Sequence, residues 1–181
     1  VRGNGSIMGV STGGFENQAG ALFEKSVATG STTVQTITVS NQGTISVGSG
    51  IVEITGSGFQ NVSGTTLTGG SFILAGVFKF PNANIVTNAA TIVLDGPTSA
   101  IQNAAGVNAL ANFATNASTG SFTIENGRNL STGAFTNAGQ VGIGPGSSTW
   151  SVAGGYSQSG GQTRLAGGVL AATGPVNIAA G

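Results

Sequence analysis

Short runs in which apolar and polar side chains alternate occur along the whole chain. Clear examples are Thr36–Val39, Thr44–Val47, Ile51–Ile54 and Gln140–Ile143. Alternation with a period of two puts successive side chains on opposite faces of an extended chain, so each run predicts a half-buried β-strand. Gly, Asn, Asp and Ser, which favour sharp turns, flank these runs. The pattern therefore predicts an all-β protein built from short strands.

A second, longer repeat is superimposed on this alternation. An apolar residue is followed two positions later by a side-chain amide, and the pair recurs at an average step of about 20 residues, the length of one coil of a solenoid. Because successive coils stack about 4.8 Å apart, amides at the same phase of the repeat would lie above one another and hydrogen-bond as a ladder. The expected members of this Asn ladder are Asn17, Asn41, Asn61, Asn88, Asn103 and Asn137.

The fold is therefore predicted to be an all-β, right-handed parallel β-helix (β-solenoid) with about 20 residues per coil. Short strands would also suit a sandwich or a barrel, but neither has a reason to place an amide at the same phase of successive units. Roughly nine coils would give a rod on the order of 40 Å long. The Ala-rich stretch 104–115 carries Gly106 and Asn112 on different faces, which argues against a helix there. We expect residues 1–181 to form one solenoid segment, either a fragment or a repeat unit of a longer rod or filament.

Composition restricts the function. Only 6 % of the residues are charged and the net charge is zero, so the chain offers no electrostatic attraction to nucleic acid. The longest apolar stretch, 72–80, is far shorter than the roughly 20 residues of a membrane-spanning helix. Since the chain has neither Cys nor His, we expect no metal site and no cofactor site.

The carboxylates offer no obvious catalytic pair. A glycosidase needs two carboxylates about 5 to 9.5 Å apart, and no two of the five acids are suitably close in the sequence, although stacking of coils could bring two together. The chain is therefore expected to have no catalytic residue and not to be an enzyme. The adjacent Glu24 and Lys25 are expected to be surface charges that point to opposite faces of a strand. The acids are Glu16, Glu24, Glu53, Asp95 and Glu125.

A few other side chains could contact a ligand. Arg128 and Arg164 would suit an anionic sugar, and Trp150 and Tyr156 would suit stacking on a sugar ring, although such arginines and aromatics more often have structural roles. Threonine-rich alternation would suit an ice-binding face only if threonines lay in register on every coil. The later coils are expected to lack them, which leaves a solvated face.

Three stretches of the chain resemble a known family. The runs 120–130, 135–141 and 156–168, which read GSFTIENGRNL, FTNAGQV and YSQSGGQTRLAGG, are similar to the repeats of large bacterial β-strand-repeat surface proteins, the filamentous adhesins and autotransporter passengers. The resemblance covers most of the chain and is strongest from Gly120 onward. It implies secretion, a β-helical rod and a surface-exposed role, and such motifs specify fold better than function.

The expected function is that of an extracellular structural or adhesive β-solenoid at the cell surface, forming a rigid rod, a stalk or a self-stacking filament. Its expected partners are further copies joined end to end, or flanking repeats, together with surface glycans; nucleic acid binding and membrane insertion are not expected. Any export signal is expected to lie outside the sequence. The alternative is a carbohydrate-binding or polysaccharide-degrading β-helix.

Overall fold

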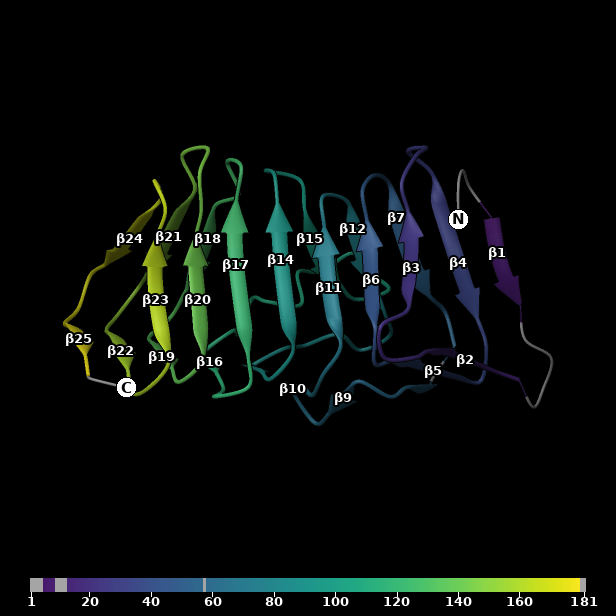
Figure 1. Ribbon diagram of the computed structural model, residues 1–181, viewed down its shortest axis with the longest axis horizontal. Coiled ribbons are helices and arrows are strands. Elements are labelled where there is room, and N and C mark those ends of the chain that lie inside the picture. Colours follow the sequence, from purple (N-terminus) through teal and green to yellow (C-terminus); the bar gives the residue numbers. More distant parts are fainter. Residues whose placement is uncertain (1–4, 9–12, 57, 180–181) are drawn as a thin grey trace.

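The chain winds into a parallel β-solenoid (Figure 1). The computed structural model describes residues 5–8, 13–56 and 58–179, and within them every regular element is a strand. There are about 8 turns, with equivalent strands roughly 21 residues apart. The predicted fold class is confirmed. The expected number of turns, nine, was slightly too high, because two turns are lengthened by insertions.

Each turn contributes strands to three faces. The first face is a seven-stranded sheet, nearest the viewer in Figure 1. From the N-terminal end it comprises β3 (Leu22–Lys25), β6 (Thr44–Val47), β11 (Ser71–Leu74), β14 (Thr91–Asp95), β17 (Ser121–Glu125), β20 (Gln140–Ile143) and β23 (Gln162–Leu165).

The second face carries a five-stranded sheet and a three-stranded sheet. The five-stranded sheet comprises β1 (Gly5–Met8), β4 (Ser31–Gln35), β7 (Ile51–Ile54), β12 (Val77–Lys79) and β15 (Ala100–Gln102). The three-stranded sheet comprises β18 (Leu130–Thr132), β21 (Thr149–Val152) and β24 (Val169–Ala172).

The third face also has two sheets, and it carries the Asn side chains of interest. The first sheet comprises β2 (Gly14–Asn17), β5 (Thr38–Asn41) and β8 (Gly58–Phe59). The second comprises β9 (Val62–Ser63), β10 (Thr66–Leu67), β13 (Thr87–Asn88), β16 (Thr115–Asn116), β19 (Phe135–Asn137), β22 (Tyr156–Gln158) and β25 (Val176–Ile178). Between named strands all pairing is parallel except that of β9 with β10.

The coil is right-handed. In Figure 1 the strands of the first face run upward on the near side, those of the second face run downward on the far side, and the chain advances from right to left. This is the hand expected for parallel strands joined by crossover connections.

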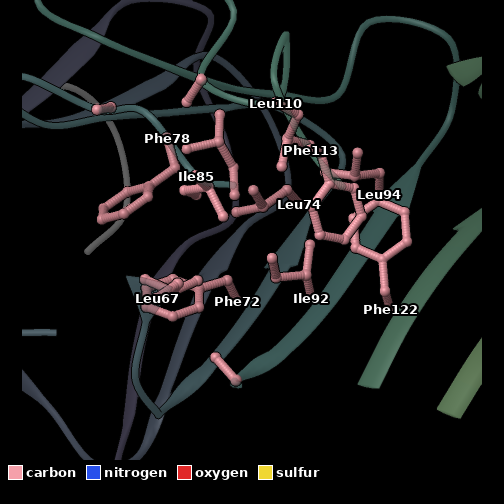
Figure 2. Packing of buried hydrophobic residues seen from close by; sticks show 14 of the residues in the cluster. Leu67, Phe72, Leu74, Phe78, Ile85, Ile92, Leu94, Leu110, Phe113 and Phe122 are labelled. Atoms are coloured by element: carbon pink, nitrogen blue, oxygen red, sulfur yellow. The ribbon is translucent and has the colours of Figure 1, made fainter. Parts of the chain in front are cut away.

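The interior is a set of side-chain columns that run along the rod. On the first face Phe72 pairs with Ile45 on one side and with Ile92 on the other, and Ile92 pairs with Phe122. All four side chains are buried, and Figure 2 shows how this central part of the core packs. Burying one such side chain contributes roughly 1.5 to 3 kcal/mol, so the cohesion of the rod comes from coil stacking upon coil.

Two insertions interrupt the regular turns. The antiparallel pair of β9 and β10 forms a small hairpin on the third face. A longer loop, residues 103–114, leaves the second face after β15 and sends Leu110 and Phe113 into the core. No helix forms in this loop, as expected, because its apolar residues anchor a series of turns instead.

The two ends of the described solenoid differ. At the C-terminal end the inward-column residues Leu165, Val176 and Ile178 are 52 to 58 % exposed, since no further coil covers them. At the N-terminal end Lys25 occupies the inward column next to Val47 and is fully buried, with its Nζ donating to the carbonyl oxygen of Val27 at 3.2 Å. The expectation that Lys25 is a surface charge was wrong, because alternation along β3 places Lys25 on the same side as buried Phe23.

Candidate functional site

The first three residues of the expected Asn ladder lie together. Asn17 and Asn41 are register partners in β2 and β5, and Nδ2 of Asn17 donates to Oδ1 of Asn41 at 2.7 Å. Asn61 continues the contact differently: its Oδ1 accepts from the main-chain N–H of Asn41 at 2.7 Å, and its Nδ2 donates to the Asn41 carbonyl oxygen at 2.6 Å. All three side chains are buried, and their amides meet polar groups that the turn would otherwise leave without a partner.

A second ladder segment lies in the C-terminal part of the chain. Asn88, Asn116 and Asn137 are successive register partners in β13, β16 and β19. Nδ2 of Asn88 donates to Oδ1 of Asn116 at 2.9 Å, and Nδ2 of Asn116 donates to Oδ1 of Asn137 at 2.9 Å. Each of these residues is fully buried. Gln158 takes the next position in register, and its buried Oε1 has no hydrogen-bond partner among the described residues.

The two ladder segments are separated at Leu67. Leu67 pairs with Asn88 in the parallel direction and with Val62 in the hairpin, so an apolar side chain stands where the column would need an amide. The hairpin shifts the chain between Asn61 and the following turn. The structure therefore contains two short ladders and not one continuous one.

Asn103, expected in this ladder, does not lie in it. It follows β15 on the second face, where its Oδ1 accepts from the main-chain N–H of Val107 at 2.9 Å and closes a turn. The residue that takes the ladder position in that coil is Asn116. Sequence reasoning missed Asn116 because the residue two positions before it is Ala114 and not a large apolar residue, and because Ile101 gives Asn103 the same local pattern.

Glycines lie directly beside the ladder because the stacked amides leave no room for a side chain. A Cβ at Gly139 would overlap the carbonyl oxygens of Gly120 and Ala117, and it would lie 2.9 Å from Nδ2 of Asn116. Gly43 stands in the same relation to Asn17, with overlap onto main-chain oxygens of the preceding coil. Gly139 and Gly43, which follow Asn137 and Asn41 by two positions, therefore belong to the ladder.

Two carboxylates that are distant in the sequence become neighbours. Asp95 and Glu125 are register partners at the ends of β14 and β17, and Oδ1 of Asp95 accepts from Nδ2 of Asn126 at 2.7 Å. No two acids are close in the sequence, and the stacking of coils, which was left open as a way to bring two together, does so for this pair on the first face. The other acids are dispersed: Glu16 lies on β2, Glu24 on β3 and Glu53 on β7.

The two arginines occupy different environments. Arg128 is half-buried in the turn between β17 and β18, where burial lowers the pKa of its guanidinium. Its Nη1 donates to the carbonyl oxygen of Asn129 at 2.8 Å, and its buried Nε has no partner among the described residues. Arg164 is exposed on β23, in register with Gly142. Arg164 is therefore the more exposed of the two arginines.

Trp150 and Tyr156 close the core, and their rings are not available to a sugar. Both are fully buried. Trp150 packs edge to face on Phe135 at a centroid distance of 4.6 Å, and its Nε1 donates to Oγ1 of Thr132 at 3.0 Å. Burial raises the pKa of the Tyr156 phenol, while its hydrogen bonds with Thr163 and Asn137 oppose that rise.

Threonines do stack in register on the later coils, contrary to our expectation. Thr66, Thr87, Thr115 and Thr136 are successive partners on the outward side of the third face, and Ser157 follows. The sequence did not reveal this column because the hairpin and the 103–114 loop make the spacing between its members unequal.

The fold and these sites define the chain as a parallel β-solenoid with few charged residues and no net charge, braced internally by amide ladders. Comparison with known proteins adds no closer identity, since no family model, curated protein or solved structure matches the chain. Over the described residues, no helix has the length and apolar character needed to cross a bilayer. The described residues also contain no group of three or more Asp, Glu, Cys or His side chains that could hold a metal ion.

Proposed function

We propose that this chain is a structural rod that acts outside the cell, as a stalk or as a subunit of a self-stacking filament at the cell surface. The observation that supports this most is the unbroken stacking of strands on the first face. Seven strands from β3 to β23 are joined only by parallel pairing with their neighbours. Their main-chain hydrogen bonds run along the rod axis, and such a rod resists bending and stretching.

The surface supports a spacer role. Short polar side chains dominate the outward positions, as in Thr44, Ser71, Thr91 and Ser121 on the first face. A face of this kind stays hydrated and carries little charge. About 8 turns at about 4.8 Å each give a length of roughly 40 Å.

Contact between ends is the proposed mode of assembly. Among the described residues, β23, β24 and β25 are the last strands of their sheets, next to the exposed Leu165, Val176 and Ile178. Open edges of this kind pair readily with other strands. The proposed partner is therefore a further coil, supplied by a second copy or by an adjoining repeat.

Placement outside the cell is supported by the resemblance of residues 120–168 to bacterial surface repeats. Protease digestion of intact cells that produce the full protein tests it. We expect the rod to be cleaved or released without lysis, and protection until lysis would contradict an external location.

Electron microscopy of the purified chain, with sedimentation at increasing concentration, tests the rod and its assembly. We expect elongated particles that associate end to end as concentration rises. Val176→Lys and Ile178→Lys should weaken this association, because a charge would be buried in the contact. Asn177→Lys, on the same strand but pointing outward, is the matched control. Compact particles that stay monomeric at all concentrations would contradict the filament.

A further inference from the structure

The first face has a notch that the rod does not need for its stability. It is open to solvent, has a volume of about 300 Å³ and is lined by residues of β17, β20 and β23 together with Pro145 and Ala166. That volume is at the small end of the range for ligand pockets. The notch exists because Gly142 on β20 and Gly144, just after it, carry no side chains next to Thr123 and Glu125 of the preceding coil.

The main chain does not demand glycine at either position. Neither Gly142 nor Gly144 has a positive φ, whereas Gly146 in the following turn does (φ 79°). Without side chains they leave a shallow floor of main-chain atoms, on which Gly142 is partly exposed and Gly144 is covered by Glu125. The turn accounts for the glycine at Gly146, but it does not account for the glycines at Gly142 and Gly144.

Polar groups from the preceding coil lean over this floor. Oγ1 of Thr123 lies 2.8 Å from the point that a Cβ would occupy at Gly142. At Gly144 the corresponding point lies 2.8 Å from Cβ and 3.4 Å from Oε2 of Glu125, so the side chain of Glu125 passes over this glycine. A hydroxyl and a carboxylate therefore converge on one side of the notch.

The opposite side carries a donor. Arg164 on β23 is the register partner of Gly142 and also lines the notch. A carboxylate only accepts hydrogen bonds, a guanidinium only donates them and a hydroxyl does both. A ligand that satisfies all three needs donors on one edge and acceptors on the other, and a ring that carries hydroxyl groups has both.

We propose that this notch binds one uncharged sugar ring of a glycan. Two neighbouring hydroxyls donate to Glu125 and Thr123, Arg164 donates to oxygens on the far edge, and the C–H face of the ring lies on Gly142. Arg164 and Thr123 stand two strand spacings apart across Gly142, about 9.6 Å, and Glu125 lies two residues further along β17, which leaves room for a six-membered ring between Arg164 and the other two side chains. The inference is independent of the rod, which needs none of these side chains.

Titration of the full chain with methyl glucoside, methyl galactoside, methyl mannoside and methyl N-acetylglucosaminide tests the site by ¹H–¹⁵N NMR. We expect at least one glycoside to bind with a Kd in the millimolar range and to shift the amide signals of Gly142 and Gly144. Glu125→Gln and Arg164→Gln should each raise that Kd about tenfold or more, because each removes a charge-assisted hydrogen bond. Glu53→Gln and Lys79→Gln, on the second face, are the matched controls and should leave the Kd unchanged.

Gly142→Val provides a second variant that fills the notch without altering charge, and it should abolish the shifts. The melting temperature and particle length of every variant are measured in parallel, so that a failed rod is distinguishable from a failed site. Absence of shifts with all four glycosides in wild-type protein would overturn the proposal, as would undiminished binding by Gly142→Val. Binding of a methyl glucuronide alone, lost in Arg164→Gln but kept in Glu125→Gln, would also overturn it and leave a simple anion site.

Discussion

Asn116 lies directly against Asn137 in the next coil, and Nδ2 of Asn116 donates to Oδ1 of Asn137 at 2.9 Å. The same Nδ2 also lies within hydrogen-bond distance of the Gln140 carbonyl oxygen, at 3.0 Å. One buried amide thus joins two coils through its side chain as well as through its main chain. The ladder therefore couples neighbouring turns at a corner where the strands are only two or three residues long.

Asn116→Leu should lower the free energy of unfolding by about 1 to 3 kcal/mol, because Asn88 and Asn137 each lose a buried hydrogen-bond partner. The midpoint of urea denaturation measures the change. Asn177→Leu is the matched control, since Asn177 is exposed on the terminal strand β25, and its effect should stay within about 0.5 kcal/mol. Equal effects of the two substitutions would show that the ladder contributes nothing specific.

Gly139→Ala should destabilise the rod by about 1 to 3 kcal/mol, because its Cβ would be forced against the carbonyl oxygens of Gly120 and Ala117. Gly133→Ala provides the comparison, since a Cβ there meets no atom within 4 Å and Gly133 has no positive φ. Thermal melts followed by circular dichroism would separate the two. If Gly139→Ala melted at the same temperature as the wild type, the coils would be able to move apart at this position without loss of stability.

Trp150→Ala should cost about 3 to 5 kcal/mol, because it empties the largest fully buried side-chain volume and leaves Oγ1 of Thr132 without its donor. Phe15→Ala, at the partly buried N-terminal end, should cost clearly less. Trp150 is also the single tryptophan of the chain, so its fluorescence reports on the core. We expect emission typical of a dry environment and protection from acrylamide until unfolding, and ready quenching of the native protein would contradict this packing.

Stability should fall at high pH through Tyr156. Burial raises the pKa of its phenol in the folded state, whereas the unfolded phenol titrates near its ordinary value of about 10. The unfolded chain therefore loses this proton at lower pH than the folded chain does. The stabilising contribution is complete below about pH 10 and is lost as the pH rises toward the folded-state pKa.

Tyr156→Phe tests this linkage, since other groups titrate over the same range. The difference in melting temperature between wild type and Tyr156→Phe should shift in favour of the variant as the pH is raised from 9 to 11. Absorbance at 295 nm follows the ionisation of the phenol directly. A pH-independent difference would show that Tyr156 ionises as freely in the folded chain as in the unfolded one.

Asn103 shows why the sequence repeat alone does not identify every residue of the ladder. Ile101 and Phe135 each precede an amide by two positions, but Ile101 lies in β15 on the second face and Phe135 in β19 on the third. Both residues are buried, and each is followed by Asn at the same spacing. The local sequence therefore does not distinguish the two patterns. Only the pairing of β16 with β13 and β19 identifies Asn116 as the ladder residue.

The sequence by itself determined the all-β class, the parallel coil, the identity of most core residues and five of the amides that meet in ladders, among them Asn41 and Asn137. These follow from alternation and from a repeat close to one coil in length, both of which are local properties of the chain. Tertiary structure alone decided the break at Leu67, the burial of Lys25, the pairing of Asp95 with Glu125 and the notch over Gly142. Each of these depends on which strands become neighbours after loops of unequal length, and that register is settled by how whole coils bury their apolar columns together.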